Sequence, residues 1–311
     1  MTEASNPTHI ADAKAQNWIE RYAPTGLLPY AQLARLDRPI GWWLLLLPCW
    51  WGQTLAQISI GGGLANHWHV LLFFVGAIVM RGAGCTLNDL ADADFDGKVE
   101  RTKRRPIPSG RVSKKQALIF LALQLILGLI ILVQFNWFTV VLAAASLLIV
   151  AIYPFMKRFT HWPQFVLGLA FNWGALVGWS SVTGSLSWAP VLLYAGGVFW
   201  TLAYDTIYAH QDKDDDILIG VKSTALLFGE RTMPWLAGFF AASLALSAAS
   251  IILAGGHLLA LMAVACAAMH AAWQLARFDH TNSDLCLKLF KSNRIYGTII
   301  LFWLLLDSIL T

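Results

Sequence analysis

The sequence contains few charged residues and no spacing of cysteines that indicates disulfide bonds or a zinc site. Charged residues occupy 13% of the 311 positions and hydrophobic residues 57%, whereas a soluble domain carries roughly a quarter charged residues. The four cysteines, Cys49, Cys85, Cys266 and Cys286, lie far from one another along the chain. The composition therefore excludes an ordinary soluble domain, and the cysteine positions exclude a disulfide framework.

Long apolar runs take the place of the missing charge. The runs are Ile40–Ile60, Trp68–Met80, Ala117–Gln134, Trp137–Met156, Pro163–Pro190, Val191–Tyr204, Met233–Ala254, His257–Ala276 and Ile295–Leu306. Most of them reach the ~20 residues that span a bilayer core, and the second does so when it is extended toward residue 88. We predict an all-α integral membrane protein, a bundle of about nine transmembrane helices.

The first 38 residues are polar and differ from the rest of the chain. Glu3, Asp12 and Glu20 make this stretch unlike a signal peptide. Two descriptions of it stay open: an amphipathic helix from Trp18 to Leu36 that lies on the membrane surface, or an irregular polar tail. No linker composition follows, so residues 39–311 are expected to form one polytopic domain.

Positive charge is distributed unevenly between the connecting segments. The 22 lysines and arginines lie in the tail, in or beside alternate connections, or at Arg81; the segments near 61–66, 135–136, 183–187 and 255–256 contain none. Positive residues mark the cytoplasmic side of a membrane protein, so the N-terminus is expected inside and the C-terminus outside. We expect a multi-pass protein of a bacterial-type inner (plasma) membrane.

Residues 88–96, NDLADADFD, place four carboxylates at the end of an apolar run. In a helix, Asn88, Asp92 and Asp96 share one face, which Asp89 approaches. Like charges at this spacing repel one another, so a bound cation would explain the arrangement. Oxygen ligands suit Mg²⁺. The alternative interpretation is an acidic helix end that is exposed to water.

The next residues, 97–115, contain eight lysines or arginines. Basic side chains opposite an acidic face would suit a Mg²⁺-diphosphate, although a basic loop also anchors membrane topology. Arg81 lies two helical turns before Asn88 on nearly the same face. We expect Arg81 to bind phosphate; an ion pair that serves packing is the alternative.

A second acidic cluster, YDTIYAHQDKDDD, occupies residues 204–216. Asp205 and Asp212 are seven residues apart with Tyr208 between them, and Asp216 follows Asp212 by four. If this stretch is helical, these side chains share a face and form a second cation site. Two facing carboxylate pairs with Mg²⁺ would hold a leaving diphosphate.

Lys157 and Arg158 end another apolar run, in YPFMKRFTHWPQ (153–164). Both are ordinary positions for charges that anchor a helix at the membrane surface. The planar guanidinium of Arg158 also matches a carboxylate bidentately. An acidic substrate that enters at this end is therefore a second interpretation.

Taken together, these motifs resemble those of the UbiA superfamily of intramembrane aromatic prenyltransferases. NDLADADFD matches the family's NDxxDxxxD motif, and RTKRRPIPSG (101–110) resembles the stretch that follows it. The second cluster, YPFMKRFTHWPQ and RLDRPIGWWLLLLP (35–48) are similar to the branch that acts on 4-hydroxybenzoate. The resemblance covers nearly the whole chain from about Arg35.

The resemblance implies nine helices around a central cavity capped by cytoplasmic loops. It implies Mg²⁺-dependent transfer of a polyprenyl group from polyprenyl diphosphate to the carbon ortho to the hydroxyl of 4-hydroxybenzoate, in ubiquinone biosynthesis, without nucleic acid or an obligatory protein partner. The implied residues are Asn88, Asp92, Asp96, Asp212 and Asp216 for metal and diphosphate, Arg81 and Lys157 for diphosphate, and Arg158 for the benzoate carboxylate. Asp205 and Tyr208 are added from the second cluster as substrate contacts.

Two alternatives stay open. A prenyltransferase with another acceptor, of the naphthoate or haem type, would carry related motifs. An ion-coupled transporter would also place carboxylates in the membrane, but it needs a polar path across it. Both acidic clusters lie on one side, and we expect no acidic residue in the outer half of the bundle.

Overall fold

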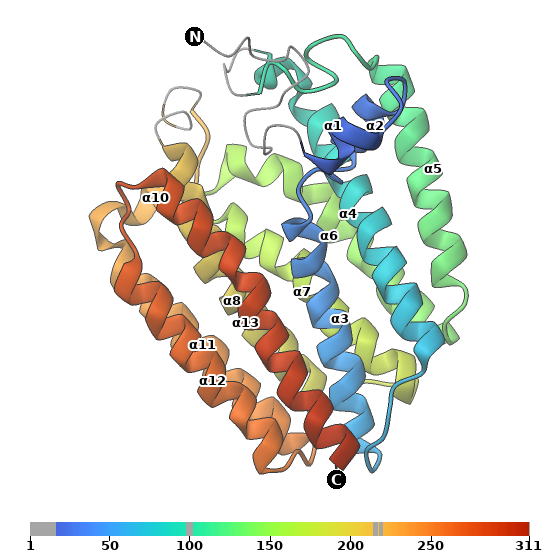
Figure 1. Ribbon diagram of the computed structural model, residues 1–311, viewed down its shortest axis with the longest axis vertical. Coiled ribbons are helices and arrows are strands. Elements are labelled where there is room, and N and C mark those ends of the chain that lie inside the picture. The colour runs from blue at the N-terminus through green and yellow to red at the C-terminus, as the bar shows by residue number, and fades with distance from the viewer. Residues whose placement is uncertain (1–16, 98–101, 214–216, 218–219, 311) are drawn as a thin grey trace. The chain divides into compact units, whose positions relative to one another are not determined.

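The protein is helical throughout the part that the structure describes. The computed structural model describes residues 17–97, 102–213, 217 and 220–310, and these contain no strand (Figure 1). The long helices are α3 (Ile40–Ser59), α4 (His67–Asp96), α5 (Lys114–Leu132), α6 (Trp137–Phe159), α7 (Pro163–Thr183), α8 (Trp188–Ala209), α11 (Thr232–Leu253), α12 (Leu258–Arg277) and α13 (Ser283–Leu310). The short elements are α1 (Trp18–Tyr22), α2 (Leu28–Leu33), α10 (Thr224–Phe228) and the 3₁₀ turns η1 (His210–Asp212) and η2 (Gly229–Arg231).

The predicted all-α membrane class is confirmed. Within the described ranges, 7 segments are both long and apolar enough to cross a membrane. Helices α3 and α8, with 20 and 22 residues, are long enough as well. They are not among these 7 segments. The count of nine transmembrane helices is therefore approximate.

Two compact units divide the chain. The N-terminal unit consists of residues 1–42 and 75–131, and the C-terminal unit of 43–74 and 132–311. Each is described by itself below. The predicted division into a tail, 1–38, and a polytopic domain, 39–311, concerns insertion into the membrane and stays a prediction.

The stretch from Trp18 to Leu36 forms two short helices, α1 and α2, in place of one long helix or an irregular tail. The side chain of Asn17 caps α1 by accepting the N–H groups of Ile19 and Glu20. Pro24 and Gly26 lie between the helices, where neither residue favours a continuous helix. An apolar cavity of about 370 Å³ lies between α1, α2 and Phe120. Attachment of this segment to a membrane surface stays a prediction.

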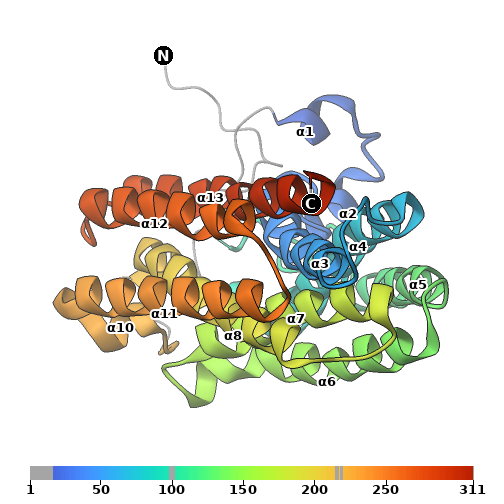
Figure 2. The ribbon, with the colours of Figure 1, turned by 90° about the horizontal axis from the view of Figure 1, so that it is seen from below.

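In the C-terminal unit, α8 packs against both α7 and α11, and α12 packs against α11 and α13 (Figures 1 and 2). Helix α7 also approaches the part of α3 in this unit closely, because glycines face the contact. A Cβ on Gly178 would collide with the carbonyl of Cys49, and a Cβ on Gly52 with the carbonyl of Ala175. Small residues allow membrane helices to approach in this way.

Buried polar side chains link three helices of the same unit. The indole N–H of Trp200 on α8 donates to Asn293 on α13 at 2.9 Å, and Asn293 donates to Gln274 on α12 at 2.9 Å. Side-chain hydrogen bonds of this kind hold membrane helices together where no hydrophobic force does so.

The expectation that the outer half contains no acidic residue is wrong. Asp307 lies in the last turn of α13 and is fully buried. Its carboxylate accepts the backbone N–H groups of His257 and Ala260, at the start of α12, at 3.2 Å each. Amides in the first turn of a helix lack partners within the helix, so this carboxylate satisfies a helix terminus.

Candidate active site

The first acidic motif lies on one face of α4, as its spacing predicted. The helix continues to Asp96, so Asn88, Asp92 and Asp96 follow one another at successive turns. Asn88 is half-buried and Asp92 is 1% exposed. The side chain of Asp96 lies outside the described side chains. This end of α4 therefore offers at least one amide and one buried carboxylate along a single face.

Arg81 lies on the same helix, half-buried and two turns before Asn88. Gly41 lies directly beside it: a Cβ at position 41 would collide with the Arg81 guanidinium. The glycine thus leaves room for the guanidinium next to the helix. The position of Arg81 on this face agrees with the prediction, and its phosphate-binding role stays a prediction.

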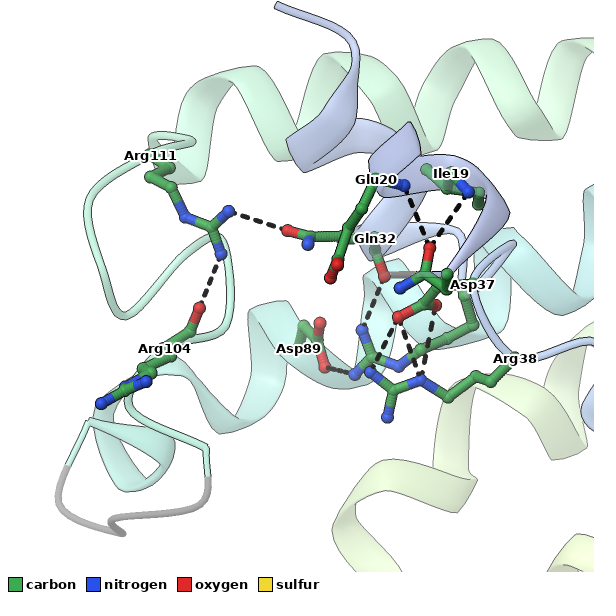
Figure 3. Close-up of polar contacts among 10 residues, drawn as sticks. Ile19, Glu20, Gln32, Asp37, Arg38, Asp89, Arg104 and Arg111 are labelled. Carbon is green, nitrogen blue, oxygen red and sulfur yellow. Dashed lines mark hydrogen bonds and ion pairs between the residues drawn. The ribbon is translucent and has the colours of Figure 1, made fainter. Parts of the chain in front are cut away.

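Asp89 does not share the surroundings of Asp92. It is completely buried, and its Oδ1 accepts a hydrogen bond from Arg35 Nη2 at 2.7 Å (Figure 3). The same oxygen lies 3.4 Å from Arg105 Nη1. Burial lowers the pKa of the Arg35 guanidinium, but Asp89 together with Cys85 and Asp37 raises it, so that the pKa lies above its ordinary value. Arg35 therefore stays charged. The sequence showed Asp89 only as a neighbour of the metal-binding face and did not indicate either arginine as its partner.

Two arginines of the basic loop after α4 form hydrogen bonds that hold the loop in place. Arg111 donates to Gln32 Oε1 at 2.8 Å and to the carbonyl of Arg104 at 2.6 Å (Figure 3). Arg105 is already bound to Asp89. Arg105 and Arg111 thus have described contacts within the N-terminal unit, and a role of the loop's cations toward a diphosphate stays a prediction.

The second acidic motif is only partly helical in the way predicted. Helix α8 ends at Ala209, and η1 follows with a tighter turn of about three residues. Asp205 and Tyr208 are half-buried near the end of α8, and the Tyr208 ring lies 4.5 Å from that of Phe290. The side chain of Asp212 and all of Asp216 lie outside the described part. The continuous α-helical face from 205 through 212 is therefore not formed.

A buried hydrogen bond helps to explain why α8 ends where it does. His210, the first residue of η1, is buried, and its Nε2 lies 3.0 Å from the hydroxyl of Thr232 at the start of α11. Nearby, the hydroxyls of Thr206 and Thr224 lie 2.7 Å apart. These contacts fix the chain direction after α8 through residues that are distant in sequence.

Lys157 and Arg158 lie in the last turn of α6, where positive charge is favourable beside the helix C-terminus. The backbone N–H of Lys222 donates to the carbonyl of Lys157 at 2.9 Å, which ties the chain beyond the second motif to this helix end. Arg158 is exposed, and its guanidinium lies 5.6 Å from the centre of the Phe155 ring. Contact of Arg158 with an acidic substrate stays a prediction.

Asn88 and Asp92 are the predicted metal ligands whose side chains the structure describes. Among the described side chains, no three His, Cys, Asp or Glu residues converge. Of the predicted ligands, Asp96, Asp212 and Asp216 are not among these side chains. Asn88 and Asp92 provide oxygen donors one turn apart, which is the donor type that Mg²⁺ prefers. The residues present fit this ion as far as they are described.

Two curated relatives share about half of their residues with this chain. The 4-hydroxybenzoate polyprenyltransferase, mitochondrial, of Arabidopsis thaliana is 52% identical over 291 residues, which cover 92% of this chain and 70% of the plant protein. The protein of the same name from Rattus norvegicus is 51% identical over 292 residues, covering 92% of this chain and 76% of its own length.

A solved structure has a similar fold. It is described as a UbiA homolog from Archaeoglobus fulgidus bound to GPP and Mg²⁺, and it matches with a TM-score of 0.69 over 90% of this chain and 99% of that one. The sequences are 19% identical. This likeness supports the fold and does not by itself assign a ligand to this chain.

The comparisons overturn the predicted location. Both relatives described above are named as mitochondrial proteins. The expectation of a bacterial-type inner (plasma) membrane, with the N-terminus in the cytoplasm and the C-terminus outside, is therefore wrong. Sequence charge shows which loops share a side of a membrane, but it carries no information about which membrane this is.

A family model also matches most of the chain. The description of that model is UbiA prenyltransferase family, and it matches residues 45–306. The matched range includes α4, the end of α6 and the end of α8, where the candidate site residues lie. The chain belongs to the UbiA prenyltransferase family.

Proposed function

We propose that this protein transfers a polyprenyl group from polyprenyl diphosphate to the carbon ortho to the hydroxyl of 4-hydroxybenzoate. The products are 3-polyprenyl-4-hydroxybenzoate and diphosphate, and the reaction is a step of ubiquinone biosynthesis. The observation that carries this proposal is the identity of about half of all residues, over 92% of the chain, with enzymes named for this reaction.

The face of α4 supplies the diphosphate end of the proposed site. Asn88, Asp92 and Asp96 hold Mg²⁺, and Arg81 contacts the phosphate oxygens from the same face. Arg81 suits this role because it is half-buried in a membrane-spanning helix, a position that is costly for a charge without a function. When bound, Mg²⁺ neutralises charge that develops on the leaving diphosphate.

Further residues are proposed from the ends of α6 and α8 in the C-terminal unit. Asp212 and Asp216 provide the second set of carboxylates, and Lys157 contacts the diphosphate. Arg158 binds the benzoate carboxylate through a charge-assisted fork. Asp205 and Tyr208 line the substrates at the end of α8, where both are half-buried.

The chemistry follows from these groups. The carbon–oxygen bond between the allylic carbon and diphosphate breaks, and the basic side chains stabilise the negative charge on the departing group. The ortho carbon of the phenol attacks the allylic cation, a new carbon–carbon bond forms, and loss of the ring proton restores aromaticity. The polyprenyl tail partitions into the bilayer, while diphosphate and benzoate stay at the polar end of the helices.

The membrane in question is proposed to be mitochondrial. This proposal rests on the names of the relatives described above. Fractionation of cells that express the full chain would test it. Recovery of the protein with another membrane would contradict the proposal.

One assay tests the function directly. Membranes containing the protein are incubated with radiolabelled 4-hydroxybenzoate, geranyl diphosphate and Mg²⁺, and the label is followed into the organic phase. We expect a labelled prenyl product that disappears when EDTA is added and returns with excess Mg²⁺. The control is membranes from the same host without the protein.

The same assay separates the alternatives. A naphthoate-type enzyme would leave 4-hydroxybenzoate unchanged and prenylate a dihydroxynaphthoate. A haem-type enzyme would prenylate haem. No product from any acceptor, at normal protein level and with Mg²⁺ present, would contradict the proposed reaction.

A further inference from the structure

The buried carboxylate of Asp89 joins three parts of the N-terminal unit. Asp89 belongs to α4, Arg35 follows α2, and Arg105 belongs to the loop between α4 and α5. The Arg35 side chain is 9% exposed and the Arg105 side chain 13%. Two cations therefore converge on one oxygen of a completely buried carboxylate.

Arg35 adopts an unusual backbone conformation at this contact. Its φ of 54° is positive, and it is the non-glycine residue with a positive φ among the described residues. A left-handed conformation costs an L-residue roughly 1–2 kcal/mol, so surrounding contacts must hold it. Besides its bond to Asp89, Arg35 donates from Nη1 to the carbonyl of Gln32 at 2.9 Å. This side chain thus links the turn after α2 to α4.

Apolar contacts also hold the loop that carries Arg105. Its residues Ile107 and Val112 pack into a small apolar cluster with Leu33, Ala93 and Ala117. Ala93 follows Asp92 on α4, so the same cluster contacts the helix at its acidic motif. Polar and apolar contacts therefore fix the loop against the same two turns of α4.

This arrangement is poorly suited to adding stability. The second oxygen of Asp89, Oδ2, is buried and has no hydrogen-bond partner among the described residues. Buried ion pairs often contribute little net stability, because desolvation offsets the attraction, while their best-attested use is to fix one arrangement of parts. The unsatisfied oxygen and the low net stability of buried ion pairs both favour a role for Asp89 in positioning the parts that it joins.

We infer that Asp89 is a positioning residue and not a metal ligand. It holds the loop 102–113 and the turn after α2 on α4, and thereby sets where the loop's remaining cations lie relative to Asn88 and Asp92. The chemical class it serves is the diphosphate of the prenyl donor. This last point rests on the proposed function, whereas the attachment of the loop does not.

Attachment of the loop can be measured without any catalysis. Full-length protein in detergent micelles is treated with trypsin, and the fragment that begins at Val112 is quantified by mass spectrometry. Val112 is 1% exposed, so cleavage after Arg111 requires the loop to leave its place. We expect Asp89→Asn to speed this cleavage by about tenfold or more, the scale of one lost charge-assisted hydrogen bond.

A matched control and a second variant keep this test decisive. Asp307→Asn alters a carboxylate that is equally buried but belongs to the C-terminal unit, and it should leave cleavage at Val112 unchanged. Arg105→Gln removes the loop's side of the contact without altering α4, so it should speed cleavage even if Asp89→Asn does not fold.

Kinetics then separate positioning from metal binding. With Asp89→Asn we expect KM for geranyl diphosphate to rise about tenfold, while KM for 4-hydroxybenzoate and the Mg²⁺ concentration for half-maximal activity stay within about twofold.

Unchanged cleavage at Val112 in both Asp89→Asn and Arg105→Gln would overturn the inference. So would a large rise in the Mg²⁺ requirement of Asp89→Asn, which would make Asp89 a ligand. If no variant and no wild-type protein transfers a prenyl group, the proposed function fails while the cleavage result still decides the loop's attachment.

Discussion

The Asp307 carboxylate accepts the backbone N–H of His257 at 3.2 Å, and through this bond the last turn of α13 caps the first turn of α12. The imidazole Nδ1 of His257 lies 3.5 Å from the same carboxylate oxygen. The connection before α12, near residues 255–256, contains no lysine or arginine. Backbone amides at the start of α12 are partners of this acidic residue.

Asp307→Ala should destabilise the protein, because it leaves two amide donors at the start of α12 without their acceptor. Loss of a helix cap costs about 1–2 kcal/mol. Thermal unfolding in detergent, followed by circular dichroism, measures the effect. Asp284→Ala, an exposed acidic residue in the first turn of α13, should change stability by less than about 0.5 kcal/mol. Equal losses in both variants would contradict the capping role.

Gly178→Ala should destabilise the contact between α7 and α3, because its Cβ would collide with the carbonyl of Cys49. Overpacking of a tight contact costs about 1–3 kcal/mol. The control is Gly238→Ala on α11, where a Cβ meets no atom within 4 Å; removal of a helical glycine there should be neutral or stabilise by up to about 1 kcal/mol. Unfolding curves of the two variants, compared in one detergent, decide the point.

Asp92→Ala and Asp212→Ala should each lower prenyl transfer by at least about a hundredfold, since each removes a proposed ligand of the ion that stabilises the leaving diphosphate. Both proteins should reach the membrane at normal levels. Turnover at saturating substrates is the measurement, and Asp284→Ala again serves as the control. Near-normal turnover in either variant would exclude a metal role for that motif.

Arg158→Ala should raise KM for 4-hydroxybenzoate by about ten- to a hundredfold, the effect of a lost charge-assisted bond. KM for geranyl diphosphate should move much less. Arg158→Lys should also be impaired, because a lysine cannot form the planar fork. Arg81→Ala should instead raise KM for geranyl diphosphate more than KM for 4-hydroxybenzoate. If Arg158→Ala changes mainly the diphosphate KM, the assignment of the acceptor pocket is wrong.

Local periodicity predicted the parts of the molecule that depend on neighbouring residues. The face that contains Asn88 and Asp92 follows from the turn of α4, and the apolar runs follow from the requirements of a bilayer. The end of α8 was not predicted. No glycine or proline marks residue 209, and the contact between His210 and Thr232 joins residues that only the fold brings together.

Long-range partners account for the remaining differences. Arg35 and Asp89 are 54 positions apart, and no spacing rule connects them. The separation of α1 from α2 was visible in principle, because Pro24 and Gly26 interrupt the amphipathic pattern. Arg105 and Arg111 hold the basic loop itself. They carry the same charge as Arg81 and Arg158, which are proposed to bind substrates, so charge alone could not distinguish the two roles.

The hydrogen bonds from Trp200 to Asn293 and from Asn293 to Gln274 fix the rotation of α8, α13 and α12 about their own axes. Turning one of these helices by a single residue, roughly 100°, would carry its side chain away from its partner and leave polar atoms unsatisfied in an apolar interior. Tyr208 lies two turns beyond Trp200 on the same helix, so the direction in which its ring points depends on a buried contact between helices two turns away.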